Sequence, residues 1–188
     1  MIKLYGSKMT SAFRCHILLE EMGIEFEEVP VDFSKAEHKS ADFLKLNPNG
    51  KVPCLIDGKL VLWESMAINR YLAGKYKPEL LGNTLEQSAK IDQWSYWVIL
   101  YVQNHLFTLL MNKDEDVIRQ AKEALIPYHQ ILDDHLARND YMIGLDFTLA
   151  DINMGSVILI NLLVKNNLSP FPNIGNWLKK MVARPAFQ

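Results

Sequence analysis

The chain has 188 residues, of which 49% are hydrophobic and 22% charged, and this composition supports a packed core and excludes a disordered chain. The formal charge is −2, and basic and acidic residues balance on both sides of Tyr76, so neither half has the basic surface expected for nucleic acid or an anionic membrane. No apolar run approaches the roughly 18 residues of a membrane span, and the start lacks a signal-peptide core, so we expect a cytoplasmic protein.

The first 31 residues are expected to form a strand, a helix and a second strand. Residues 2–5 and 26–31 are short β-rich runs. Apolar residues recur between them at helical spacing, and Gly23 ends the helix. They are Phe13, Ile17, Leu18 and Met22. A helix that links neighbouring strands predicts a parallel βαβ unit.

Two more strands and a helix follow the looser segment 32–46. The strands are expected at 52–56 and 60–63, because Asp57-Gly58 between them is a strong signal for a two-residue hairpin. A helix over 65–76 then completes a βαβ–ββα order.

The segment 77–86 contains proline and glycine without periodicity, and we expect it to be a linker. It separates a first domain over 1–76 from a second over 87–188. The later apolar periodicity is helical throughout, so the second domain is predicted to be all-helical. The expected helical runs are 84–110, 116–136, 148–163 and 174–182, the third beginning with a capping box at Thr148 and Asp151.

Two short motifs in the first domain predict a binding site for a small peptide. If the Val52-Pro53 bond is cis, the Val52 N–H and C=O face outward and are available to an extended peptide. The helix that begins at Glu64-Ser65 points its first free N–H groups at an anion beside this edge. A peptide that carries a carboxylate fits both features.

These motifs resemble the glutathione S-transferase family, whose first domain has a Val-cis-Pro and a Glu/Gln-Ser pair at this spacing. The likeness covers essentially the whole chain, and it implies an α/β thioredoxin-like N-terminal domain, an all-α C-terminal domain, a homodimer and glutathione as cosubstrate. The serine-type N-terminal pattern resembles bacterial, beta-like members. The segments that carry the likeness are Ile2–Tyr5, Leu18–Gly23, Thr148–Asp151 and Arg184–Phe187.

The resemblance implies that the protein stabilises the glutathione thiolate, since a thiol pKa near 8.5 leaves only a few per cent ionised at pH 7. A shift of about two pKa units requires roughly 2.7 kcal/mol. One hydroxyl donor is not expected to supply all of this, and a helix N-terminus beneath the same sulfur is expected to contribute the rest. Ser11 is the first candidate, because it precedes the helix as a natural N-cap and matches the catalytic position of beta-like members. Thr10 and Tyr5 follow, since Met9 occupies the usual serine-class position and cannot donate.

The remaining groups of glutathione have candidate partners in the same domain. Ser65 is expected to bind the γ-glutamyl carboxylate, and Glu64 the ammonium group. Lys35 and Lys51 are candidates for the glycyl carboxylate, and Lys39 is a weaker one.

An apolar electrophile site is expected in the helical domain. Four residues recur there at three to four positions on one helix face, either as a substrate wall or as a core stripe. They are Trp97, Tyr101, His105 and Thr108. The other histidines lack metal-ligand spacing, so no metal is expected. Cys15 and Cys54 are interpreted as small buried hydrophobic residues.

The resulting prediction is a glutathione S-transferase of the detoxification type, which conjugates glutathione to small hydrophobic electrophiles. A glutathione-dependent isomerase or peroxidase on the same fold is an alternative. The other alternative is a non-catalytic binding or regulatory protein, since fold alone does not fix function. Met9 is the feature that favours it.

Overall fold

The structure is a computed structural model that describes residues 1–188. The chain divides into two units, Met1–Pro78 and Glu79–Gln188. The first is a mixed sheet with helices and the second is helical, so the expected fold class is confirmed. None of the helices is long and apolar enough to cross a membrane.

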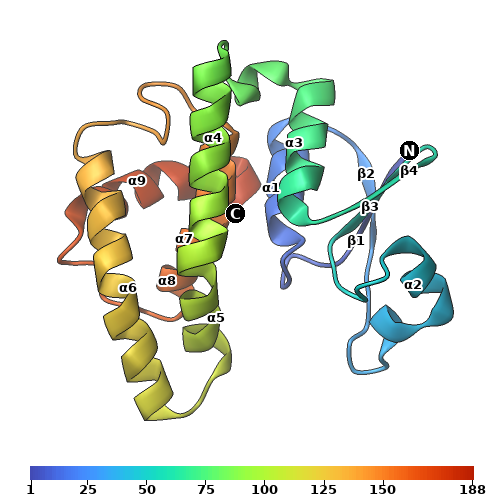
Figure 1. Cartoon of the computed structure of the whole chain (residues 1–188), viewed down its shortest axis with the longest axis horizontal. Coiled ribbons are helices and arrows are strands. Elements are labelled where there is room, and N and C mark those ends of the chain that lie inside the picture. Colours follow the sequence, from blue (N-terminus) through green and yellow to red (C-terminus); the bar gives the residue numbers. More distant parts are fainter. The chain divides into compact units, whose positions relative to one another are not determined.

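The first unit is built on a four-stranded sheet in the order β2-β1-β3-β4. Strand β1 pairs in parallel with β2 and antiparallel with β3, and β3 pairs antiparallel with β4. Figure 1 shows α1 and α3 on one face of this sheet and α2 on the other. The elements are β1 (Ile2–Tyr5), α1 (Phe13–Glu21), β2 (Phe26–Val29), α2 (Ala41–Leu46), β3 (Cys54–Asp57), β4 (Leu60–Trp63) and α3 (Ser65–Tyr76).

Three details differ from the sequence expectation. Strand β2 ends before Pro30 and β3 begins after Pro53, because a proline has no N–H to donate to a ladder. Helix α2 lies within the segment that was expected to be loose. Its N-cap is Ser40, whose hydroxyl accepts the N–H of Phe43 at 3.2 Å.

The second unit is all-helical apart from two isolated β-bridges at residues 141–146. The helix expected over 84–110 is interrupted by a π-helical segment, so its residues do not keep a single 3.6-residue periodicity. The elements are α4 (Leu85–Trp97), the π segment (Val98–Gln103), α5 (Asn104–Met111), α6 (Glu115–Leu136), α7 (Leu149–Ile158), α8 (Ile160–Leu163) and α9 (Pro172–Val182).

Helix α7 is the centre of this unit, and all ten of its residues are buried. The expected capping box is present at its start. The Asp151 carboxylate accepts four hydrogen bonds there, from the Met142 N–H at 2.8 Å, the Trp177 indole at 3.1 Å, and the N–H and hydroxyl of Thr148 at 3.0 and 3.2 Å. Burial raises the pKa of Asp151 to about 6, while these donors favour the ionised form.

A second buried carboxylate, Asp133 of α6, caps the N-terminus of α9. It accepts the N–H and side-chain amide of Asn173, both at 2.8 Å, and the N–H of Ile174 at 3.0 Å. The negative charge also interacts favourably with the helix dipole. Asp133 therefore fixes α9 to α6.

His129 of α6 should make the protein less stable in mild acid. Its ring is 2% exposed against Phe171, its Nε2 has no partner, and burial lowers its pKa to about 4. An unfolded histidine titrates near 6.5, so between these values the unfolded chain binds a proton that the folded chain does not, and stability falls as the pH decreases. We expect His129→Leu to lose less stability than the parent between pH 7.5 and pH 5, by about 2 kcal/mol in urea unfolding.

The raised pKa of Asp151 makes stability increase as the pH decreases, which is opposite to the effect of His129. This contribution cancels in the comparison, because the parent and His129→Leu both contain Asp151. Gln120→Leu, at an exposed position of the same helix, is the control and should keep the full acid loss. An equal loss in His129→Leu would contradict the prediction.

Candidate functional site

The turn between β1 and α1 lies directly against the Val52-Pro53 step. Gly6 has φ +115°, and a Cβ built there would be 2.8 Å from the Ala12 Cβ and 3.0 Å from the Val52 Cβ. Only glycine allows this approach. Nε2 of buried His16 is 3.2 Å from the Gly6 carbonyl oxygen and donates to it, since a carbonyl only accepts. The turn is therefore fixed against the predicted peptide-binding edge.

The Val52-Pro53 bond is cis, as predicted. Strand β3 begins at Cys54, so Val52 lies outside the sheet ladder. The loop before it is organised by Asn47, a buried residue whose amide donates to the Lys51 carbonyl at 2.6 Å and whose oxygen accepts the Asn49 N–H at 3.0 Å. The Val52 N–H and C=O make no hydrogen bond within the chain.

The start of α3 combines a strained residue with a buried serine. Glu64 has φ +71°, which costs a non-glycine residue on the order of 1–3 kcal/mol. Ser65 is 7% exposed, and its Oγ accepts a hydrogen bond from Nη1 of Arg14 at 3.1 Å. Because Oγ accepts from Arg14, its own proton is available to an acceptor in the site.

Arg14 is a candidate functional residue that sequence reasoning missed. It is 3% exposed in α1, and burial lowers its pKa to about 10, with Glu64 acting in the opposite direction. The guanidinium therefore stays charged at neutral pH. It places a positive charge directly behind Ser65, where the sequence predicts an anionic group. The sequence signal that could have identified Arg14 is a charged residue at a position on the apolar face of α1.

The three candidate hydroxyls have different surroundings. The expectation that Ser11 is the N-cap of α1 is wrong, because the N-cap is Ala12, whose N–H donates to the Thr10 hydroxyl at 3.2 Å. The Thr10 hydroxyl in turn donates to the Ser7 carbonyl at 2.8 Å. Ser11 is half-buried in the turn, and its hydroxyl makes no hydrogen bond within the chain. The Tyr5 ring packs edge-on against Phe43, with centroids 5.9 Å apart.

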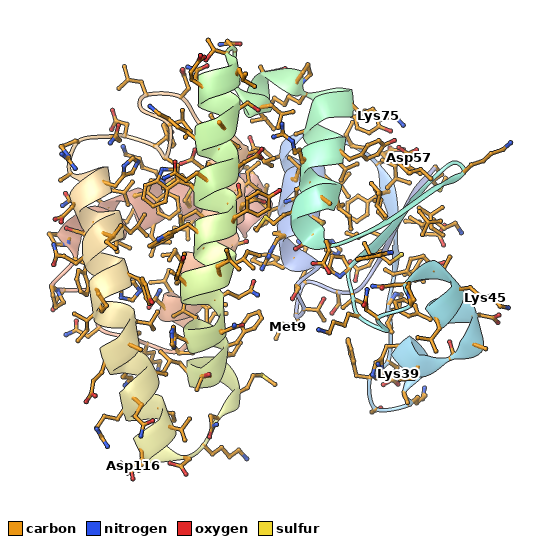
Figure 2. The ribbon with its side chains drawn as sticks, viewed as in Figure 1. Met9, Lys39, Lys45, Asp57, Lys75 and Asp116 are labelled. Carbon is orange, nitrogen blue, oxygen red and sulfur yellow. The ribbon has the colours of Figure 1, made fainter.

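Met9, which occupies the usual serine-class position, is 91% exposed in the same turn, where Figure 2 labels it.

The three lysine candidates have different surroundings. Lys35 pairs with Asp32 at 3.3 Å. Nζ of Lys39 lies 3.4 Å from the Asn49 carbonyl, and Lys51 precedes Val52 with an exposed side chain. Lys39 and Lys51 thus flank the loop that carries the cis-proline.

The four electrophile-site candidates lie on the α4, π and α5 segments of the second unit. Tyr101 and His105 pack on Tyr128 of α6 at 5.7 and 6.1 Å between ring centroids, and Trp97 does so at 6.1 Å. Thr108 instead donates its hydroxyl to the Asn104 carbonyl at 2.9 Å. The structure therefore gathers the three rings around Tyr128, which the sequence did not single out.

The cysteines offer no nucleophile. Both are buried, and burial raises the pKa of Cys15 to about 12 and that of Cys54 to about 11, so both are thiols at neutral pH. No group of three or more histidine, cysteine or acidic side chains is arranged to hold a metal ion.

Comparison with known proteins gives a consistent result over both units. The glutathione S-transferase N-terminal domain matches residues 1–74, and the C-terminal domain matches residues 91–185. A probable glutathione S-transferase GSTF2 of Oryza sativa subsp. japonica is 36% identical, covering 100% of this chain and 94% of the relative. Glutathione S-transferase 3 of Zea mays is 37% identical, covering 100% of this chain and 91% of the relative.

Solved structures agree. Glutathione S-transferase-I bound with lactoylglutathione has a TM-score of 0.92 and 36% identity, covering 100% of this chain and 96% of the other. Glutathione S-transferase I from maize, in complex with an atrazine glutathione conjugate, has a TM-score of 0.91 and 35% identity, covering 98% of this chain and 93% of the other. These relatives are plant proteins, so the expected likeness to bacterial, serine-type members is not supported.

Arg14 should influence glutathione binding through Ser65. Ser65→Ala is expected to weaken binding by about 1.5–3 kcal/mol, the value of a hydrogen bond to a charged group. Arg14→Lys keeps the charge but loses the guanidinium geometry and should weaken binding by about 1 kcal/mol. Calorimetric titration of both single variants and the double variant should show non-additive effects.

Ser169→Ala, an exposed serine of the other unit, is the control and should bind as the parent does. Additive losses in the double variant would show that Arg14 does not act through Ser65. Circular dichroism checks that each variant is folded.

Proposed function

The chain belongs to the glutathione S-transferase family, and on that premise we propose that it conjugates the thiolate of glutathione to small hydrophobic electrophiles. The observation that carries the proposal is the contact of the Gly6 turn with Val52. It brings a hydroxyl-bearing helix start beside a backbone edge that is free to bind a peptide. Relatives bound to lactoylglutathione and to an atrazine glutathione conjugate support the same chemistry.

Glutathione would bind as an added extended segment along Val52. Its cysteinyl backbone pairs with the Val52 N–H and C=O, as a peptide does at a free sheet edge. At one end, the Ser65 hydroxyl, oriented by Arg14, donates to the γ-glutamyl carboxylate. Glu64 binds the ammonium group of the same residue.

The glycyl carboxylate lies at the other end of this binding mode. Lys39 and Lys51 are the cations beside the cis-proline loop, and we assign the glycyl contact to them. Lys35 has a smaller role, because its ammonium group already pairs with Asp32.

Ser11 is the proposed donor to the glutathione sulfur. Its hydroxyl has no partner within the chain, whereas the Thr10 hydroxyl already donates its one proton to Ser7. A hydrogen bond to the thiolate and the N-terminus of α1 together supply the roughly 2.7 kcal/mol that a two-unit pKa decrease requires. Thr10 and Tyr5 are the alternatives to be tested.

In the chemical step, the thiolate sulfur forms a bond to the electrophilic carbon. The bond to the leaving group breaks, and its electron pair departs with that group. The catalytic contributions are proximity and thiolate stabilisation. The aromatic cluster of Trp97, Tyr101 and His105 is proposed as an apolar wall for the electrophile. A homodimer and a cytosolic location complete the proposal.

Removing the Ser11 hydroxyl should raise the pKa of bound glutathione. We expect Ser11→Ala to shift the thiolate absorbance titration upward by about 1–2 units and to lower kcat/KM near pH 6.5 by roughly 10- to 100-fold. Glutathione affinity should change little, because the hydroxyl interacts with the thiolate and not with the peptide backbone.

Thr10→Ala and Tyr5→Phe are the matched comparisons and should leave the titration in place. If Tyr5→Phe alone reproduces the shift, the Ser11 assignment is wrong. Unchanged titrations in all three variants would leave the helix N-terminus as the sole activating group. Absence of glutathione binding in the parent protein would overturn the proposed function.

A further inference from the structure

The ring of His16 in α1 is a buried titratable group at the candidate site. It is 1% exposed and packs edge-on against Phe26 of β2, with ring centroids 5.2 Å apart. Its Nε2 lies 3.2 Å from the Gly6 carbonyl oxygen, and its Nδ1 lies 3.5 Å from Oε2 of Glu28 in β2. A carbonyl and an ionised carboxylate only accept hydrogen bonds, so both ring nitrogens face an acceptor.

The number of protons on the ring decides which of these contacts are hydrogen bonds. A neutral imidazole has one N–H and donates to Gly6 or to Glu28, whereas the doubly protonated ring donates to both. The imidazole is the only partner of the buried Gly6 carbonyl, and leaving that carbonyl unpaired costs free energy. The Glu28 side chain is 41% exposed and can turn to water. We therefore expect the neutral ring to keep its proton on Nε2 and to release Glu28.

Gly6 connects the ring to the candidate catalytic turn. Its N–H donates to the Val29 carbonyl of β2 at 3.0 Å, and its C=O accepts from His16 of α1. The same glycine lies against Val52 with no room for a Cβ. Glu28 directly precedes Val29, so its ion pair with the ring ties the end of β2 to α1 at the turn.

The other charged groups around the ring have partners of their own. Glu27 lies opposite Lys3 in the pairing of β2 with β1 and forms an ion pair with it at 2.9 Å, on the other face of the sheet from Glu28. Nearby titratable groups on the face covered by α1 and α3 are bound elsewhere: Lys8 pairs with Glu20, Arg14 and Cys15 contact Ser65, and Asp57 accepts hydrogen bonds from Tyr71 and Lys75. Glu28 is therefore the carboxylate that acts on the ring.

We propose that Glu28 is a positioning residue for the conjugation reaction, acting through the doubly protonated ring of His16 on the Gly6 turn. Glu28 fixes the imidazole at Nδ1 while Nε2 donates to Gly6, and the turn that carries Ser11 is thereby fixed beside Val52. The link is complete only while Nδ1 carries its proton, so its contribution is present at lower pH and is lost as the pH increases. This role of Glu28 rests on the proposed function.

Nitrogen-15 NMR of the whole chain with labelled histidine reads the ring protons directly, and His16→Gln identifies the His16 signals. In the parent, both ring nitrogens should be protonated at the acid end of a titration from pH 5 to pH 9, and Nε2 alone at the other end. Glu28→Ala should lose the Nδ1 proton at lower pH than the parent, because a nearby carboxylate stabilises the charged ring. Glu27→Ala is the matched control, since its side chain is 44% exposed in the same strand, and it should follow the parent.

Transferase activity tests the positioning itself. At pH 5.5, kcat/KM of the parent should exceed that of Glu28→Ala by about two- to fivefold, the range for a partly exposed ion pair, and the ratio should approach one at pH 8.5. Ionisation of the glutathione thiol cancels in this ratio, because both proteins keep Ser11 and the N-terminus of α1. Calorimetry should show unchanged glutathione affinity, since Glu28 contacts no group of the proposed binding mode.

His16→Gln tests whether Glu28 acts through the ring, because glutamine keeps an amide donor but lacks the second ring nitrogen. In this background, Glu28→Ala should have no pH-dependent effect on kcat/KM. A loss that is equal at both pH values, a loss that persists in the His16→Gln background, or a parent-like Nδ1 titration in Glu28→Ala would each overturn the role of Glu28 alone. Absence of transferase activity in the parent would overturn the proposed function and this role with it.

Discussion

The proposed glutathione site depends on the close approach of three backbone segments at Gly6. The glycine has no side chain to separate Ala12 from Val52, so the start of α1 and the cis-proline step share one contact. Nε2 of His16 donates to the Gly6 carbonyl, and the hydrogen bonds of Asn47 fix the loop before Val52. With any larger residue at this point, the candidate hydroxyl and the peptide-binding edge would be displaced from one another.

Electrostatics supports the same geometry. Helices α1 and α3 both begin in this part of the first unit, and each N-terminus contributes partial positive charge. The buried guanidinium of Arg14 adds a full charge behind Ser65. Glutathione carries two carboxylates and a sulfur that must become anionic. The first unit therefore provides positive potential where the proposed binding mode places these groups.

Local sequence signals predicted the elements that depend on neighbouring residues. The bounds of β1, β4 and α3 agree with the expected ranges, because hydrophobic alternation, Asp57-Gly58 and helical periodicity act over a few positions. The cis-proline and the Glu64-Ser65 helix start were recognised as motifs. Helix α2 was missed because six residues are too few to show a period, and the π segment has no compositional signal. Arg14 and Asp133 were missed because their partners lie 51 and 40 residues away.

The bonds of Met142 have a consequence for how the connection after α6 changes between related sequences. The Met142 N–H donates to Asp151 and its C=O accepts from His135, and Asp151 also begins α7 and binds Trp177. The path of this connection is thus inherited with the helical core, because shifting it would break hydrogen bonds that the core needs.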